Sequence, residues 1–239
     1  MASVPPGVTA FSDADVRRYV DRWLRLEARY SGHAYDGSGT GLRVVVGAKE
    51  SRIAVSAPHA VNHRRDAADK LADRGTGGLA ELLAELVPLT ALIVAARDSG
   101  DANWDNGHRL KTRLAGLQPR PLFVLDIHGM TGTDTADVEI GLGLSPTQAS
   151  RALAQSLVSE LATAGLNCSM DATYTARRVT TITSWAQLSL GIPAIQIELA
   201  SAVRPPDGKS ESLAKVVASL VRGLRRIDAA LRRPACAGR

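Results

Sequence analysis

Leu122-Phe-Val-Leu-Asp-Ile-His128 is an apolar run that ends in a histidine, and Ile53-Ala-Val-Ser-Ala-Pro-His59 is a second run of the same kind. A third run, Ala194-Ile-Gln-Ile-Glu198, ends in a glutamate. Short, continuous apolar runs are typical of strands that are buried on both faces of an α/β sheet. Ligands of such sheets bind at the carboxyl ends of the strands. The sequence therefore predicts a polar site at one edge of a mostly parallel sheet.

Helical and strand-like segments alternate along the rest of the chain. Further strands are expected over residues 42–47, 91–96 and 137–144, and the first of these is expected to lie beside the strand at 53–57. The glycine-rich stretches at 32–41 and 129–136 are expected to be loops. Helices are expected over residues 12–30, 79–86, 106–117, 145–165, 184–190 and 210–231.

This alternation predicts an α/β fold with a single three-layer domain over residues 1–239. The sheet is expected to be mixed but mostly parallel, with helices on both faces. Residues 1–11 contain consecutive prolines and a glycine, so we expect an irregular N-terminal arm there. Residues 233–239 are expected to be a disordered tail.

The composition narrows the class of protein. The chain has 239 residues, of which 45% are hydrophobic, enough for a full core and too many for a disordered chain. Its two cysteines, Cys168 and Cys236, lie outside any CxxC motif, so neither a cysteine metal site nor a structural disulfide is expected. We see no signal peptide and no apolar stretch of the roughly 18 residues that a membrane span needs. The expected location is the cytoplasm, with no membrane partner.

The formal net charge of +5 raises nucleic acid as a partner. The arginines cluster on the first and last predicted helices, without the interleaved aromatic residues on which bases would stack. We interpret these clusters as solvated helix faces and expect no nucleic-acid partner. A basic nucleic-acid-binding module stays the less favoured alternative, and its affinity would fall steeply with salt.

The two strand-end histidines suit a metal ion. Three protein ligands with an open fourth position make a catalytic zinc site, and His59 and His128 are the first two candidates. For the third ligand the sequence leaves Asn62, His63 and Asp73 open. Asp73 lies where the chain must turn tightly into a helix, and His63 follows His59 by four residues.

Two further acids accompany these candidates. Asp126 precedes His128 by two residues and so lies on the same side of the strand. A carboxylate in that place commonly holds a ligating imidazole in one tautomer. Glu198 is a separate glutamate that can act as a base toward water in a metal site; its alternative role is an ion pair with Arg204. The pattern indicates a metal-dependent hydrolase.

Five short motifs occur in order between residues 56 and 198: Ser56-Ala-Pro-His59, Asp73-Arg-Gly-Thr76, Arg97…Asp101-Ala-Asn103, Asp126-Ile-His128-Gly129 and Glu198. Together they resemble the N-formylglutamate amidohydrolase family. That family belongs to the zinc carboxypeptidase-like group, with the succinylglutamate desuccinylases, aspartoacylases and poly-γ-glutamate hydrolases. The resemblance implies a zinc carboxypeptidase-like (phosphorylase/hydrolase-like) fold. It also implies that Zn²⁺ is held by His59, Asp73 and His128, with Glu198 as the general base.

The same resemblance assigns Arg97 and Asn103 to a clamp for a substrate carboxylate, which a guanidinium group can hold bidentately. The family often has an arginine directly after the asparagine, where this chain has Trp104. The missing charge could come instead from Arg177, Arg178 or Arg204, and we include Arg178 among the expected substrate-binding residues.

The expected function is zinc-dependent hydrolysis of the amide bond of a small N-acyl amino acid or related amide that carries a carboxylate. The alternative on the same fold is a metal-free protein that binds a small molecule. The oligomeric state is left open by the sequence.

Overall fold

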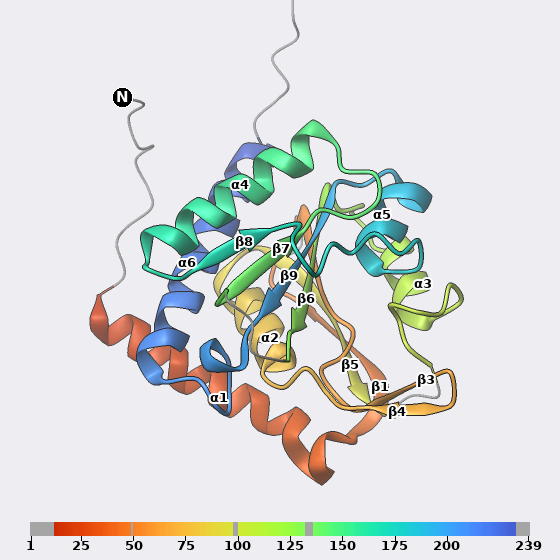
Figure 1. The fold of residues 1–239 in the computed structure, drawn as a ribbon, viewed down its shortest axis with the longest axis horizontal. Helices are drawn as coiled ribbons and strands as arrows, with labels where there is room; N and C mark the ends of the chain where they lie inside the picture. Colours follow the sequence, from red (N-terminus) through yellow and green to blue (C-terminus); the bar gives the residue numbers. More distant parts are fainter. Residues whose placement is uncertain (1–11, 49, 98–99, 132–135, 233–239) are drawn as a thin grey trace, which may run out of the picture.

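The computed structural model of this chain describes residues 12–48, 50–97, 100–131 and 136–232. The predicted arm at 1–11 and tail at 233–239 lie outside the described residues. Helices and strands alternate as expected (Figure 1). In chain order the elements are α1 (Asp13–Tyr35), β1 (Gly37–Val46), β2 (Ile53–Ala57), β3 (His63–Arg65), β4 (Ala68–Lys70), α2 (Thr76–Leu86), β5 (Leu89–Ala96), α3 (Arg109–Ala115), β6 (Phe123–Gly129), β7 (Val138–Gly141), α4 (Gln148–Thr163), β8 (Cys168–Met170), α5 (Ile182–Leu190), β9 (Ala194–Leu199), a short 3₁₀ helix (Ser201–Val203) and α6 (Ser210–Arg232).

A seven-stranded sheet with the order β1-β5-β2-β6-β9-β7-β8 forms the centre of the molecule. Its four middle strands, β5, β2, β6 and β9, are parallel to one another, whereas β1 and β7 run antiparallel to their inner neighbours. The sheet is therefore mixed and mostly parallel, as the sequence predicts. Strands β2, β6 and β9 are adjacent, so their carboxyl ends lie side by side at one edge of the sheet.

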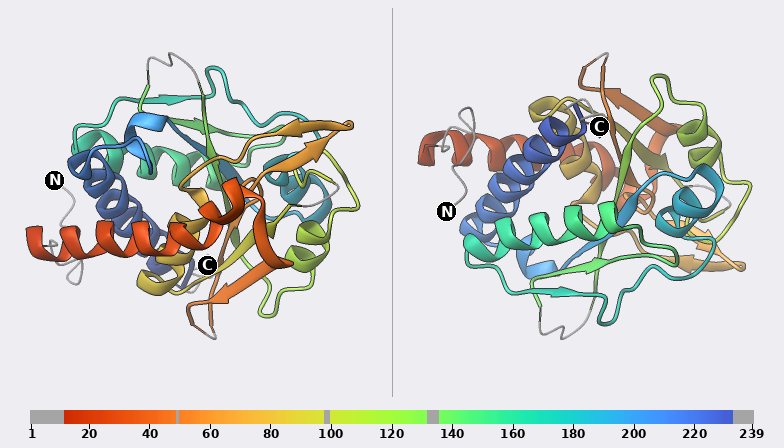
Figure 2. Two further views of the ribbon diagram at one scale, coloured as in Figure 1. Left: turned by 90° about the horizontal axis from the view of Figure 1, so that it is seen from below. Right: turned by 90° about the horizontal axis from the view of Figure 1, so that it is seen from above.

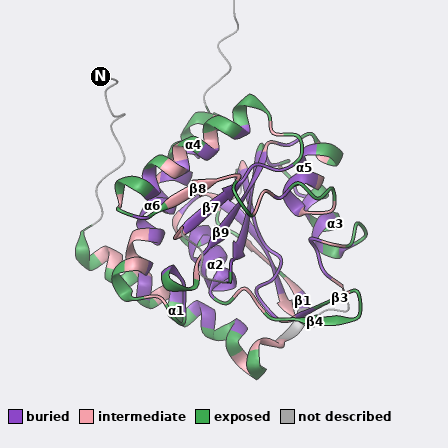
Figure 3. Cartoon of the chain, viewed as in Figure 1, coloured by how far each residue is buried: buried purple, intermediate pink, exposed green. Residues whose placement is uncertain are grey.

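Helices cover both faces of the sheet. Helices α1, α2, α4 and α6 lie on one face and α3 and α5 on the other, which Figure 2 shows from two further directions. Every residue of β2, β6 and β9 is buried, and Figure 3 shows these strands as the buried centre of the fold. Burial on both faces explains why their sequences are continuous apolar runs rather than alternating ones. Among the described residues, no helix is both long and apolar enough to span a membrane.

Three local predictions were wrong. Strand β1 is not a neighbour of β2, because β5 lies between them and pairs with both. The stretch at 32–41 is not a loop throughout, since β1 already begins at Gly37. The small hairpin of β3 and β4, and the edge strand β8, were missed. Each of these three strands has only three residues, too short for an apolar period to be recognised.

Helix α1 anchors the turn that leads into α2. The indole Nε1 of Trp23 donates to the carbonyl oxygen of Gly75 at 2.7 Å. The carboxylate of Glu27 accepts from the backbone N–H groups of Gly75 at 2.7 Å and Gly78 at 2.8 Å. Gly75 has φ of 92°, a left-handed conformation that favours glycine. These contacts fix the backbone close to Asp73, one of the expected metal ligands.

Candidate metal centre

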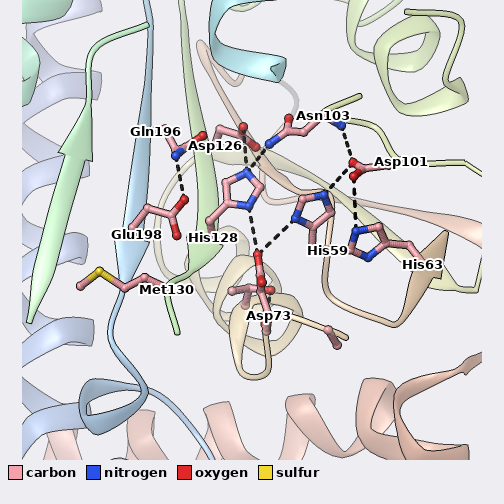
Figure 4. A network of polar contacts seen from close by, with 12 residues as sticks. His59, His63, Asp73, Asp101, Asn103, Asp126, His128, Met130, Gln196 and Glu198 are labelled. Atoms are coloured by element: carbon pink, nitrogen blue, oxygen red, sulfur yellow. Dashed lines mark hydrogen bonds and ion pairs between the residues drawn. The ribbon is translucent and has the colours of Figure 1, made fainter. Parts of the chain in front are cut away.

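The structure brings together the four residues that the sequence marked as metal ligands and base (Figure 4). His128 and Glu198 are directly opposite each other on β6 and β9, and His59 follows the end of β2. Asp73 reaches the same place from the loop before α2, where its backbone N–H donates to the carbonyl oxygen of His59 at 2.8 Å. All four residues line one cavity of about 300 Å³.

The two imidazoles present the same ring nitrogen to one carboxylate oxygen. Oδ2 of Asp73 lies 3.3 Å from Nδ1 of His59 and 3.0 Å from Nδ1 of His128. Ligand atoms around a tetrahedral zinc ion, at bond lengths near 2.0–2.1 Å, lie about 3.3 Å from one another. Both of these distances, with all three atoms within 4.8 Å of one another, fit the donor set of a single zinc ion.

The outer nitrogens of both imidazoles contact separate buried carboxylates. Nε2 of His59 lies 2.7 Å from Oδ1 of Asp101, and Nε2 of His128 lies 3.1 Å from Oδ2 of Asp126. Asp126 is itself held by Ser56, whose hydroxyl donates to Oδ1 at 2.6 Å. Histidines that bind metal usually donate their second ring N–H to such a carboxylate, which fixes the tautomer and aims the other nitrogen at the ion. The arrangement turns both Nδ1 atoms toward Oδ2 of Asp73, where a metal ion could be held.

The electrostatics of this cluster favour a bound cation. Burial lowers the pKa of His59, but its hydrogen bonds with Asp101 and Asp73 outweigh burial, so the pKa is raised. For His128, burial is outweighed in the same way by Asp126 and Asp73, and the pKa lies well above its ordinary value. Burial raises the pKa of Asp73, but the two imidazoles lower it overall. The negative charge that raises the pKa values of the two imidazoles would equally stabilise a cation held between them and Asp73.

Glu198 is a buried carboxylate in the same cavity. Burial raises its pKa to about 8, although the nearby His128 acts to lower it. Its Oε1 accepts a hydrogen bond from Nε2 of Gln196 at 2.7 Å. The alternative of an ion pair with Arg204 is not what the structure shows, because the described contacts of that guanidinium group are to backbone carbonyls.

Arg204 joins the three segments that carry the site. Its guanidinium group donates to the carbonyl oxygens of Leu199 at 3.0 Å, Arg74 at 2.7 Å and Met130 at 3.1 Å. These carbonyls follow Glu198, Asp73 and His128, respectively, by one or two residues. Gly129 leaves room for the guanidinium group, since a Cβ there would lie 2.6 Å from Nε of Arg204.

We expect Arg204→Met to lower the free energy of unfolding by about 2 kcal/mol or more, because it removes three hydrogen bonds from a buried guanidinium group to backbone carbonyls. Urea denaturation measures the change. Arg74→Met is the matched control: its side chain is about half exposed and its ion pair among the described residues is with Asp207, so the loss there should stay below about 1 kcal/mol. Equal losses in the two variants would show that Arg204 does not join these segments.

A second group of possible ligands, His59, His63 and Asp101, lies beside the first. The ring of His63 stacks on that of His59, with centroids 4.1 Å apart and an angle of 5° between the planes. Nε of Arg65 donates to Oδ2 of Asp101 at 2.6 Å, so a guanidinium group already offsets the charge of this carboxylate. The geometry therefore favours Asp73 over His63 as the third ligand.

The structure does not bring Arg97 to the cavity. Its guanidinium group contacts Oδ1 of Asp69 at 2.5 Å and Oδ1 of Asp36 at 3.4 Å, and these pairs hold it away from the site. Asn103 does line the cavity, with Nδ2 2.7 Å from Nε2 of His128 and Oδ1 accepting from the backbone N–H of Ile182 at 2.7 Å. The expected clamp of Arg97 with Asn103 is therefore absent from this cavity.

Arg178 lines the cavity as the sequence analysis expected, and Arg65 and Trp104 line it with Arg178. Sequence reasoning missed Arg65 and the contact of Asp101 with His59. Asp101 stands in one of the quoted motifs, so its acid was visible in the sequence. Arg65 carried no such signal, because the hairpin that presents it was not predicted.

No protein-family model matches this sequence, and no match was found among curated proteins. Several solved structures are similar in fold. The gene product Atu2144 from Agrobacterium tumefaciens is 15% identical with a TM-score of 0.58, and the match covers 84% of this chain and 99% of that one. A bacteriophage poly-γ-glutamate hydrolase is 15% identical with a TM-score of 0.51, over 81% and 91% of the two chains. The zinc-free form of YNDL is 16% identical with a TM-score of 0.52, over 80% and 93%. At these identities the likeness is one of fold: these structures share the α/β arrangement with a mixed, mostly parallel sheet that the sequence predicts.

Proposed function

We propose that this chain is a zinc-dependent amidohydrolase that cleaves the amide bond of a small N-acyl amino acid or a related amide. His59, Asp73 and His128 would hold the metal, Glu198 would be the general base, and Asp126 would orient the imidazole of His128. The observation that carries the proposal is the convergence of two Nδ1 atoms on one carboxylate oxygen, beside a buried glutamate in the same cavity.

The chemistry follows from the residues present. A zinc ion held there would supply Lewis acidity, for polarising a carbonyl group and for acidifying water. The carboxylate of Glu198 would accept a proton from the attacking water and deliver it to the nitrogen of the leaving amine. Burial raises the pKa of Glu198 to about 8, and a nearby cation would lower it toward the range in which a base is effective at neutral pH.

Similar proteins support this class of reaction. One structure of like fold is a poly-γ-glutamate hydrolase, whose name describes the hydrolysis of an amide polymer, and the structure of YNDL is described as zinc-free. Arginines of α1 and α6 pair with glutamates of neighbouring helices, Arg22 with Glu85 of α2 and Arg226 with Glu160 of α4, so part of the basic charge is offset within the protein. We therefore propose a small-molecule amide as the partner, not nucleic acid.

The test of this function is a metal analysis joined to a panel of amides. The untagged protein should contain about one zinc ion per chain. Hydrolysis of at least one N-acyl amino acid should stop after the metal is removed by a chelator and should return when zinc is restored. Turnover that survives complete removal of the metal would contradict the proposal.

The panel also separates the two functions that share this fold. A metal-free binding protein would bind an N-acyl amino acid with the same affinity before and after chelation, and would hydrolyse none of the panel with zinc present. That outcome would contradict the proposed hydrolase function and would support the function of a metal-free binding protein.

A further inference from the structure

Two guanidinium groups stack on one tryptophan at the wall of the cavity. The Cζ atom of Arg178 lies 3.1 Å from the centroid of the Trp104 ring, and that of Arg65 lies 4.9 Å from it. The indole is fixed by a hydrogen bond from its Nε1 to Oδ1 of Asp66 at 2.9 Å. All three stacked residues line the cavity that contains Glu198. Stacking on an aromatic ring holds a guanidinium plane in place.

Each of these arginines is anchored through Nε by a described hydrogen bond. Nε of Arg65 donates to Oδ2 of Asp101 at 2.6 Å, and Nε of Arg178 donates to the hydroxyl of Thr180 at 2.9 Å. Within the described part of the chain, neither arginine has a hydrogen bond from its two Nη atoms, and Arg178 has no carboxylate partner. The two Nη atoms form one edge of the guanidinium group, and their paired N–H groups match the geometry of a planar anion.

The other arginines near the site are already engaged. Arg97 is held by Asp69 outside the cavity, and Arg204 donates to three backbone carbonyls. Among the described arginines, Arg65 and Arg178 are those that line the cavity with the metal-ligand candidates. The guanidinium N–H groups that face a substrate there therefore come from these two side chains, and the charge of Arg65 is shared with Asp101.

We propose that Arg65, Trp104 and Arg178 form an anion-binding subsite, and that the substrate is an amide carrying a carboxylate or a phosphate within reach of the scissile bond. This proposal rests on the proposed function for the identity of the scissile bond, but binding of the anion requires only the side chains described above. The subsite takes the place of the clamp that the resemblance assigned to Arg97.

The test compares ligands of nearly the same shape that differ in charge. N-acetyl-L-glutamate carries two carboxylates, and its diamide carries none. We expect the protein to bind the acid roughly 30-fold or more tightly than the diamide by titration calorimetry, with or without zinc, because hydrogen bonds to a charged group are stronger than those to a neutral one. The double variant Arg65→Gln/Arg178→Gln should reduce this preference to about threefold or less.

Two further variants make the test specific. Arg177→Gln is the matched control, since Arg177 neighbours Arg178 but pairs with Asp171 and does not line the cavity. It should keep the full preference for the acid. The single variant Arg178→Gln keeps the pair of Arg65 with Asp101 and changes only an exposed side chain, so it should fold even if the double variant does not. It should lose most of the preference for the acid over the diamide.

The outcomes separate this subsite from the proposed function. An equal loss in Arg177→Gln, or a preference that survives in Arg178→Gln and in the double variant, would overturn the subsite even if amides are hydrolysed. A preference that depends on the two arginines would support the subsite even if no amide is hydrolysed. Tighter binding of N-acetyl-O-phospho-L-serinamide than of N-acetyl-L-glutamate would identify phosphate as the anion, and the reverse order would identify carboxylate.

Discussion

Glu198→Gln is expected to lower kcat on the true amide substrate by roughly 10²–10⁴-fold, the usual contribution of general acid–base catalysis. The glutamine keeps the shape of the side chain and its place on β9 opposite His128, but it cannot accept the proton. Zinc content and the melting temperature should stay near those of the parent protein, because Glu198 is not one of the converging ligand atoms. Steady-state kinetics and elemental analysis of the same preparation measure both quantities.

The control for this variant is Glu85→Gln, which removes a carboxylate of the surface pair with Arg22 and should leave kcat unchanged. Near-native turnover of Glu198→Gln would exclude Glu198 as the base. A loss of zinc in Glu198→Gln would instead show that the glutamate is a ligand.

The second large effect is expected at the metal ligands. His128→Ala and Asp73→Asn should each weaken zinc binding by more than the roughly 10–100-fold that loss of an outer carboxylate costs. The reason is that each changes one member of the group in which Nδ1 of His59 and Nδ1 of His128 lie 3.3 Å and 3.0 Å from Oδ2 of Asp73. Competition with a chromogenic chelator measures the affinity, so the result does not depend on activity.

Two other histidines serve as comparisons in this experiment. His33 is exposed on α1, and His33→Ala should bind zinc as the parent does. His63 stacks on His59 without lining the cavity, so His63→Ala should lose less affinity than Asp73→Asn. If His63→Ala strips the metal and Asp73→Asn keeps it, His63 is the third ligand and Asp73 is not.

The sequence predicted the sheet and the strand-end residues because both depend on local pattern. Buried parallel strands need continuous apolar runs, and a histidine or acid at the end of such a run interrupts that pattern. His128 and Glu198 could be found in this way, and their strands proved to be neighbours. The pairing of β1 with β5 could not be found, because strand order depends on contacts between distant segments.

The substrate side of the site was predicted less well for a related reason. Arg97 was chosen from a motif, but its partner Asp69 lies on the hairpin of β3 and β4, whose short strands carry no apolar period. The same hairpin presents Arg65 to the cavity. Side chains from loops and small hairpins are positioned by tertiary contacts, so their neighbours cannot be inferred from spacing along the chain.

The most direct test of the metal centre is a crystal structure of the zinc-soaked protein, with anomalous scattering data collected at the zinc edge. We expect one strong anomalous peak about 2.0–2.2 Å from Nδ1 of His59, Nδ1 of His128 and Oδ2 of Asp73. A peak bound instead by His63 and Asp101, or a cavity without any peak at saturating zinc, would contradict it.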